Sequence, residues 1–269
     1  MAEETTACEM QNQKIVNPEQ WLAARKELLA KERELTHLRD EISRRRRELP
    51  WEKVEKRYVF DGREGKLTLA ELFEGRSQLI TYHFMFGPGW KEGCVGCSFH
   101  ADHMDGAIQH LEQHDVSLVV VARAPLAEIQ AFQKRMGWKF KWVSSHESDF
   151  NYDFHVSFKA NAGKVYYNYQ EQDVQSEEMS GTSVFARGAA GEVFHTYSSY
   201  ARGGDSFLGA HHYLDITPKG RNENGPNYSL ADWVRHHDRY GTAGQVHSSG
   251  RFVAAEDLQT TCGCETEPS

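Results

Sequence analysis

The chain has 269 residues, of which 39% are hydrophobic and 12% aromatic, and its formal net charge at pH 7 is -8. This composition suffices for a packed globular core, whereas the negative charge argues against general binding to nucleic acid or anionic lipid, which needs clustered Lys and Arg. Residues 1–13 lack the basic start and apolar stretch of a signal peptide, and no later run reaches the ~18 apolar residues of a membrane-spanning helix. We therefore expect a cytoplasmic protein without nucleic-acid or membrane partners.

A long amphipathic helix is predicted near the N-terminus. Asn17-Pro18 is typical of a helix N-cap followed by proline in the first turn, and apolar residues then recur at helical spacing from Glu19 to about Glu48. The arginines at 44–47 suit the negative end of the helix dipole, and we interpret them as a solvated face. This helix could pack on its own domain or support a homodimer.

Strand-like and helix-like segments alternate through the middle of the chain. The expected elements are strand Tyr58–Phe60, a turn at Asp61-Gly62, strand Leu67–Leu69, short helix Ala70–Phe73, strand Ser77–Met85, helix Phe99 to about His114, strand Val116–Val121, helix Pro125–Gly137, strand Phe140–Val143, and a hairpin of Thr182–Ala186 with Val193–Tyr197. Parallel strands joined by helices and finished by a hairpin predict an α/β protein with a central mixed sheet flanked by helices. This is the ground plan of thioredoxin-like proteins.

Cys94 and Cys97 form a C-x-x-C between the strand Ser77–Met85 and the following helix. A cysteine at a helix N-terminus meets unpaired backbone N–H groups and the positive end of the helix dipole, which favour the thiolate. In the cytoplasm thiols are kept reduced, so such a pair is more often catalytic or metal-binding than a structural disulfide. The spacing allows the two sulfurs to form a disulfide or to share a metal ion.

A series of longer motifs accompanies the cysteines. They are Tyr82–Pro88, Gly93–Phe99, Ala101-Asp102, Arg123–Leu126, Arg135–Trp138, Trp142–Ser145, Ser148–Asp153 and Thr196–Ser198. Together they resemble the bacterial thioredoxin-like family filed as domain of unknown function 899, over roughly residues 14–240. The resemblance implies a thioredoxin-like fold with an N-terminal helical extension and a C-terminal helical segment, and it brings no settled reaction or substrate.

Two departures from related proteins stand out. Gly181-Thr182-Ser183 occupies the place where thioredoxins and peroxiredoxins usually carry a cis-proline, and His100 stands where the family more often has a bulky apolar residue. For the domain organisation we expect a disordered tail at 1–13, a helical extension at 14–50, the thioredoxin-like domain at 51–240 and a tail at 241–269.

The first functional hypothesis is an oxidoreductase that acts on a small-molecule thiol, disulfide or peroxide. Cys94 would attack because it lies nearest the helix start, and Cys97 would resolve the resulting intermediate. The residues that could line the same site are Tyr82, His83, Thr182 and His195.

The second hypothesis is a copper, zinc or iron centre in a redox enzyme that acts on a small molecule. Cys94, Cys97, His100 and His103 offer suitable ligands within ten residues. At ~100° per residue, however, the last three span an arc of about 120° around a helix, so all four could bind one ion only around an irregular first turn. Beyond this set, the sequence indicates no cofactor.

A third class, a noncatalytic binding protein, stays open because a fold does not fix an activity. Cys262 and Cys264 near the C-terminus could relay electrons to the C-x-x-C, or they could be incidental thiols in a tail.

Overall fold

The computed structural model describes residues 13–160, 162–174, 176–221, 223, 230–247 and 249–255. The chain divides into two compact units, one of residues 1–50 with 216–220 and the other of residues 51–215 with 221–269. We call the second unit the core domain.

The N-terminal unit contains one long helix, α2 (Pro18–Arg47). The Asn17 side chain accepts a hydrogen bond from the Gln20 N–H (2.9 Å), and the Gln20 side chain accepts one from the Asn17 N–H, which completes a capping box. At the other end, Arg44 and Arg45 pair with Glu41 on the same helix, at 2.8 and 2.6 Å. The predicted helix and its N-cap are confirmed, and this part of the arginine run forms ion pairs within the helix.

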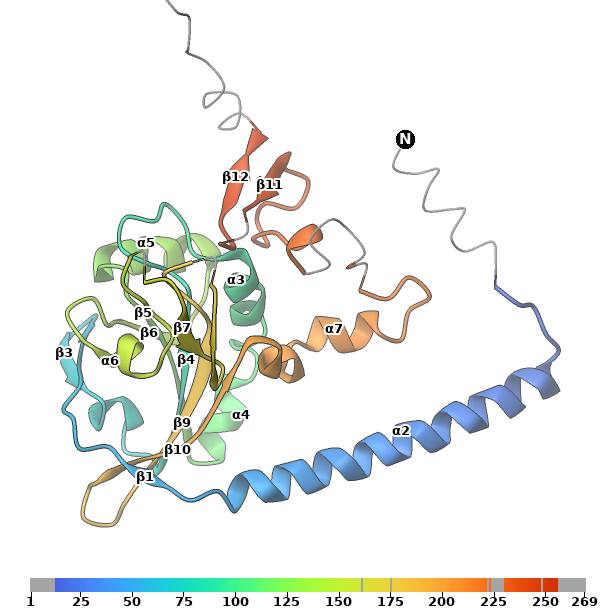
Figure 1. The fold of residues 1–269 in the computed structure, drawn as a ribbon, viewed down its shortest axis with the longest axis horizontal. Helices are drawn as coiled ribbons and strands as arrows, with labels where there is room; N and C mark the ends of the chain where they lie inside the picture. The colour runs from blue at the N-terminus through green and yellow to red at the C-terminus, as the bar shows by residue number, and fades with distance from the viewer. Residues whose placement is uncertain are drawn as a thin grey trace, which may run out of the picture. The chain divides into compact units, whose positions relative to one another are not determined.

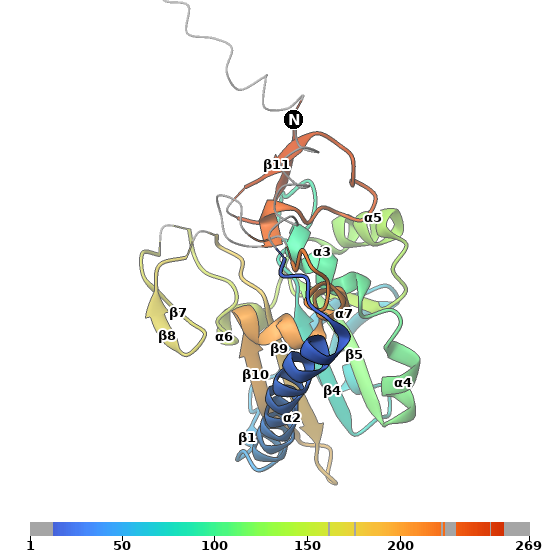
Figure 2. The same ribbon diagram turned by 90° about the vertical axis from the view of Figure 1, so that its right-hand side faces the viewer.

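The core domain is built on a mixed eight-stranded sheet (Figure 1). Its strands, in order across the sheet, are β1 (Glu52–Lys53), β10 (Val193–Tyr200), β9 (Gly181–Arg187), β4 (Gln78–His83), β5 (Val116–Ala122), β6 (Lys141–Ser144), β2 (Val59–Gly62) and β3 (Gly65–Thr68). Two small ribbons complete the strands, β7 (Val165–Tyr167) with β8 (Gln170–Gln172), and β11 (Gly244–Val246) with β12 (Phe252–Ala254). The β7–β8 ribbon stands to one side of the main sheet (Figure 2).

The centre of this sheet has the thioredoxin-like arrangement. Strand β4 runs parallel to β5, which runs parallel to β6, while β9 runs antiparallel to β4 and β10 antiparallel to β9. Each parallel step is made through helices on the same face, as right-handed crossovers in one direction require. The predicted fold class is therefore confirmed, including the closing hairpin.

Helices cover the sheet on both faces. The helical elements are α3 (Val95–Asp102), α4 (Ile108–Gln113), α5 (Leu126–Met136), α6 (Phe150–Asp153), α7 (Gly209–Leu214) and the 3-10 helices η2 (Glu71–Phe73), η3 (Ala201–Phe207) and η4 (Leu230–Asp232). One core, between the sheet and α3 to α5, contains both cysteines together with Tyr82 and Phe132. Another, beneath η2 and α6, contains Phe73 and Phe150. The cysteines thus belong to one face of the sheet.

The helix expected over 99–114 is interrupted. Helix α3 ends at Asp102, and α4 begins only at Ile108. The break has long-range partners: Asp102 accepts a hydrogen bond from Trp138 Nε1 (2.7 Å), and Asp105 accepts one from the Phe140 N–H (3.1 Å). Because these carboxylates bind groups beyond α5, local periodicity could not locate the break.

Two further expectations differ from the structure. Asp61 and Gly62 lie within β2, paired with Lys66 and Gly65, so the turn falls at residues 63–64. Part of the expected tail at 241–269 is ordered as the hairpin β11–β12. Among the described residues, no helix combines the length and the apolar character that crossing a membrane demands.

Candidate active site

The cysteines lie where the chain leaves β4 and enters α3. Cys94 occupies the N-cap position of α3, and Cys97 lies in its first turn. The Cys94 N–H donates to the Met85 carbonyl (3.0 Å), and the Met85 N–H donates to Cys97 Sγ (3.4 Å). These two hydrogen bonds hold both cysteines against Met85, two residues beyond the end of β4. Both are free thiols, with exposures of only 5% for Cys94 and 2% for Cys97.

The two thiols have opposite acidities. A hydrogen bond from the Cys97 thiol lowers the pKa of Cys94, assisted by the backbone N–H groups of Gly96 and Cys97 and opposed by burial. Burial raises the pKa of Cys97 well above its ordinary value, and the interaction with Cys94 raises it further. Thiolate character is therefore concentrated on Cys94, as expected for a cysteine at a helix start.

Tyr82 lies directly beside Cys97. Its hydroxyl hydrogen bonds to Cys97, and burial next to the two cysteines raises the pKa of the phenol well above its ordinary value. Thr182 pairs with Tyr82 across β4 and β9, so the two side chains share the cysteine face of the sheet. Tyr167 is a neighbour that sequence reasoning missed: it interacts electrostatically with Cys97, and burial raises its pKa to about 12. Tyr167 follows a long loop, so no local sequence pattern indicated that it would lie near the cysteines.

His83 and His195 lie on the opposite face. Side chains alternate along a strand, so His83 points away from Tyr82 and packs on Phe150, at 5.3 Å between ring centroids. A chain of hydrogen bonds joins the two histidines through Ser183 and Ser198: His83 Nε2 to Ser183 Oγ (3.0 Å), Ser183 Oγ to Ser198 Oγ (2.9 Å), and Ser198 Oγ to His195 Nε2 (2.8 Å). Of the lining residues expected from the sequence, the structure thus places Tyr82 and Thr182 on the cysteine face and the two histidines behind the sheet.

The two histidines after the C-x-x-C make contacts with other parts of the protein. His103 Nδ1 donates to the Phe99 carbonyl (2.7 Å), and its Nε2 accepts the Ala210 N–H (3.0 Å), so both ring nitrogens are occupied. The His100 ring is held between Tyr82 and Phe207, at centroid distances of 4.3 and 5.8 Å, and burial lowers its pKa to about 4. In the part of the chain that the structure describes, no three His, Cys, Asp or Glu residues are grouped to hold a metal ion. In this structure both ring nitrogens of His103 thus have partners within the protein, and a metal site at Cys94, Cys97, His100 and His103 stays a prediction.

The C-terminal part of the chain, of which residues 241–269 were expected to be a tail, contacts the residues around the cysteines. The Val95 N–H donates to the Gly250 carbonyl (2.8 Å), and the Gly93 carbonyl contacts His236 Nε2 (2.9 Å). Ser249-Gly250, just before the apolar run Phe252–Ala254, is a turn signal, and it could have indicated this hairpin. Cys8, Cys262 and Cys264 lie outside the described residues.

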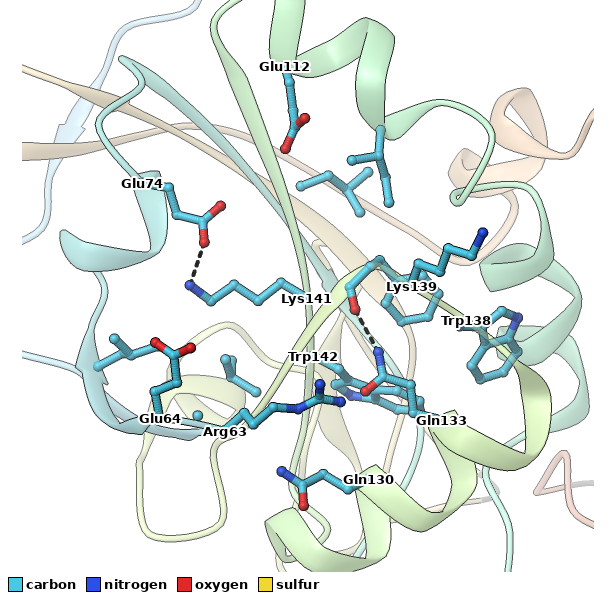
Figure 3. A pocket seen from close by; sticks show the side chains of 16 residues that line it. Arg63, Glu64, Glu74, Glu112, Gln130, Gln133, Trp138, Lys139, Lys141 and Trp142 are labelled. Carbon is cyan, nitrogen blue, oxygen red and sulfur yellow. Dashed lines mark hydrogen bonds and ion pairs between the residues drawn. The ribbon is translucent and has the colours of Figure 1, made fainter.

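A separate cavity of about 670 Å³ opens beside the start of β6 (Figure 3). Neither cysteine lines it. Several of its polar groups are paired within the protein: Lys141 Nζ lies 2.7 Å from Glu74 Oε1, and Gln133 Nε2 donates to the Phe140 carbonyl (2.6 Å). The cavity is thus distinct from the cysteine site.

Comparison with known proteins places the chain in a family. Among solved structures it is similar to peroxidoxin BcpB from Mycobacterium tuberculosis (13% identity, TM-score 0.40, 60% of this chain and 94% of that one). It is also similar to PrxQ from Xylella fastidiosa (12%, TM-score 0.38, 61% and 94%) and to a 2-Cys peroxiredoxin from Plasmodium vivax (11%, TM-score 0.37, 61% and 94%). No curated protein matches. A family model described as bacterial protein of unknown function (DUF899) matches residues 10–240, and the chain belongs to this family, as the motifs in its sequence led us to expect.

Proposed function

We propose that the protein is a thiol-based oxidoreductase in which Cys94 attacks the substrate and Cys97 resolves the intermediate. The observation that carries this proposal is the pair of hydrogen-bonded free thiols at the start of α3, with the pKa lowered on Cys94 and raised on Cys97. A nucleophile must be a thiolate, whereas the resolving thiol can stay protonated until it is needed.

The reaction with a disulfide has two steps. The Cys94 thiolate attacks one substrate sulfur, the substrate S–S bond breaks, and the departing thiolate takes a proton from solvent. Cys97 then loses its proton and attacks Cys94, which releases the second substrate thiol and leaves a Cys94–Cys97 disulfide. Tyr82 donates a hydrogen bond that favours the Cys97 thiolate during this second step. The substrate gains two electrons, and an external dithiol returns them to the protein.

A metal-dependent reaction has less support from these residues. It would need His103 to abandon hydrogen bonds at both ring nitrogens. A noncatalytic binding role would not explain why the pKa of Cys94 is lowered while that of Cys97 is raised. We therefore place the chemistry on the dithiol alone.

Differential thiol labelling with mass spectrometry tests the proposal. In a background with Cys8, Cys262 and Cys264 changed to serine, we expect a reversible Cys94–Cys97 disulfide across a dithiothreitol redox titration. Cys97→Ser should trap a mixed disulfide between Cys94 and a small disulfide such as hydroxyethyl disulfide, and Cys94→Ser should form none. The proposal is wrong if no reversible disulfide forms, or if Cys94→Ser retains the disulfide-reducing activity of the parent.

A further inference from the structure

The turn between β11 and β12 lies directly on the attacking cysteine. Gly250 has φ +82°, and a Cβ added there would come within 2.5 Å of Cys94 Sγ. The Gly250 carbonyl also accepts a hydrogen bond from the Val95 N–H (2.8 Å). Figure 1 shows the β11–β12 hairpin beside the start of α3. Cys94 is therefore buried by a segment more than 150 residues further along the chain, and glycine is the residue that allows so close an approach.

Several contacts hold this hairpin in place. Phe252 packs in an apolar cluster that includes Val95 and Phe99 of α3. Its ring also lies 5.8 Å from the Arg235 guanidinium, and the Arg251 guanidinium lies 5.3 Å from the Trp90 ring.

The preceding part of the C-terminal segment is tied to the cysteine loop as well. Glu92, two residues before Cys94, pairs with Arg239 (2.7 Å) and lies 3.1 Å from His236 Nδ1. The hairpin and the segment that leads into it therefore rest on the residues that flank Cys94.

We propose that the β11–β12 hairpin is a specificity element that admits small hydroperoxides to Cys94 and excludes protein disulfides. The inference rests on the proposed function, because it takes Cys94 as the attacking group. A protein disulfide must bring its own backbone to the sulfur that is attacked, but Gly250 already occupies the space against Cys94 and accepts the hydrogen bond of the Val95 N–H. A hydroperoxide needs only to bring one oxygen to the sulfur.

A hydroperoxide would be reduced at this site in two steps. The Cys94 thiolate attacks the terminal peroxide oxygen, the O–O bond breaks, and the alkoxide takes a proton from solvent to leave as the alcohol. Cys94 is then a sulfenic acid. The Cys97 thiol attacks its sulfur, the S–S bond forms, and water leaves. A small dithiol reduces the disulfide and restores both thiols.

The rates at which Cys94 reacts with a small and with a large oxidant test this inference. In the background without Cys8, Cys262 and Cys264, the rate of Cys94 oxidation by hydrogen peroxide is compared with the rate of its reaction with a protein disulfide, oxidised thioredoxin. Gly250→Ala should displace the turn and raise the rate with oxidised thioredoxin by about tenfold, which corresponds to ~1.4 kcal/mol of activation free energy. Phe252→Ala should raise this rate as well by loosening the hairpin, so in both variants the ratio of the thioredoxin rate to the peroxide rate should rise above that of the parent.

Gly241→Ala is the matched control. Gly241 has φ +88° in the same C-terminal segment, but no atom lies within 4 Å of an added Cβ, so this variant introduces the backbone strain without the contact on Cys94. Its rates with hydrogen peroxide and with oxidised thioredoxin should equal those of the parent. The inference is overturned if the parent reacts equally fast with both oxidants, or if neither Gly250→Ala nor Phe252→Ala changes the thioredoxin rate. A Cys94 that reacts with neither oxidant in any variant would instead refute the proposed function.

Discussion

The hydroxyl of Tyr82 hydrogen bonds to the sulfur of Cys97 inside the core of the protein. Tyr82 belongs to β4 and Cys97 to α3, so the contact joins the central strand to the helix that carries the dithiol. A buried thiolate is costly unless a donor stabilises it. Burial raises the pKa of Cys97, and the Tyr82 hydrogen bond is among the contacts that lower it. Tyr82 is thus a positioning residue for the resolving step.

Removal of this hydroxyl should slow resolution without slowing the first attack. Hydrogen bonds to charged groups contribute about 1.5–3 kcal/mol, so Tyr82→Phe should reduce the rate of Cys94–Cys97 disulfide formation by roughly tenfold or more. Stopped-flow measurement of the intrinsic fluorescence after mixing with hydrogen peroxide separates the two phases. Tyr166→Phe, at an exposed tyrosine of the β7–β8 ribbon, should change neither phase. A purely structural role for Tyr82 would predict equal slowing of both phases and no shift in the pH dependence of the second.

Much of the fold follows from local sequence patterns. The apolar run of β5, the glycine that ends α5 and the alternating residues of β9 and β10 each specify an element within a few residues of its true bounds. The C-x-x-C could be placed at a helix start for the same reason. Alternation along β4 also contained the information that only one of Tyr82 and His83 can face the cysteines.

The remaining features depend on contacts between distant parts of the chain. The break after Asp102 is stabilised by Trp138, and the cover of Cys94 comes from Gly250. His103 donates to the Phe99 carbonyl and accepts the Ala210 N–H, and spacing along a helix could not indicate that both ring nitrogens have these partners. Such partners are set by tertiary packing, so a single sequence without related sequences gives little information about them.

Buried histidines should make the protein sensitive to acid. Burial lowers the pKa of His83 from 6.5 to about 3 and that of His100 to about 4. Between these values and 6.5 the unfolded chain binds protons that the folded protein does not, so the stability that neutral His83 and His100 provide is complete above pH 6.5 and is lost as the pH falls. Each histidine contributes a slope of at most about 1.4 kcal/mol per pH unit.

His83→Gln isolates one of these contributions. Urea unfolding at pH 7.5 and at pH 5 should show a smaller loss of unfolding free energy for this variant than for the parent, even if the variant is less stable at both. His110→Gln, at an exposed position of α4, should keep the parent slope. Equal pH slopes for His83→Gln and the parent would contradict the assignment of acid sensitivity to this buried ring.

The last prediction concerns an ion pair at the end of β5. Arg123 Nε donates to Glu178 Oε1 (2.7 Å), and Ser157 Oγ donates to Glu178 Oε2 (2.6 Å). The Glu178 side chain is 2% exposed, and burial raises its pKa although Arg123 opposes this effect. Removing one partner leaves a buried charge alone, so Arg123→Met should cost about 3–5 kcal/mol of unfolding free energy at pH 7.

A double-mutant cycle distinguishes this electrostatic cost from lost packing. Replacing both partners, with Arg123→Met and Glu178→Met, removes the lone charge, and the double variant should recover most of the stability that Arg123→Met loses. The defect of Arg123→Met should also shrink as the pH falls, because protonation of Glu178 neutralises the unpaired carboxylate. Strictly additive losses in urea unfolding, together with a defect that is independent of pH, would mean that Arg123 stabilises the fold by packing on Tyr152 rather than by pairing with Glu178.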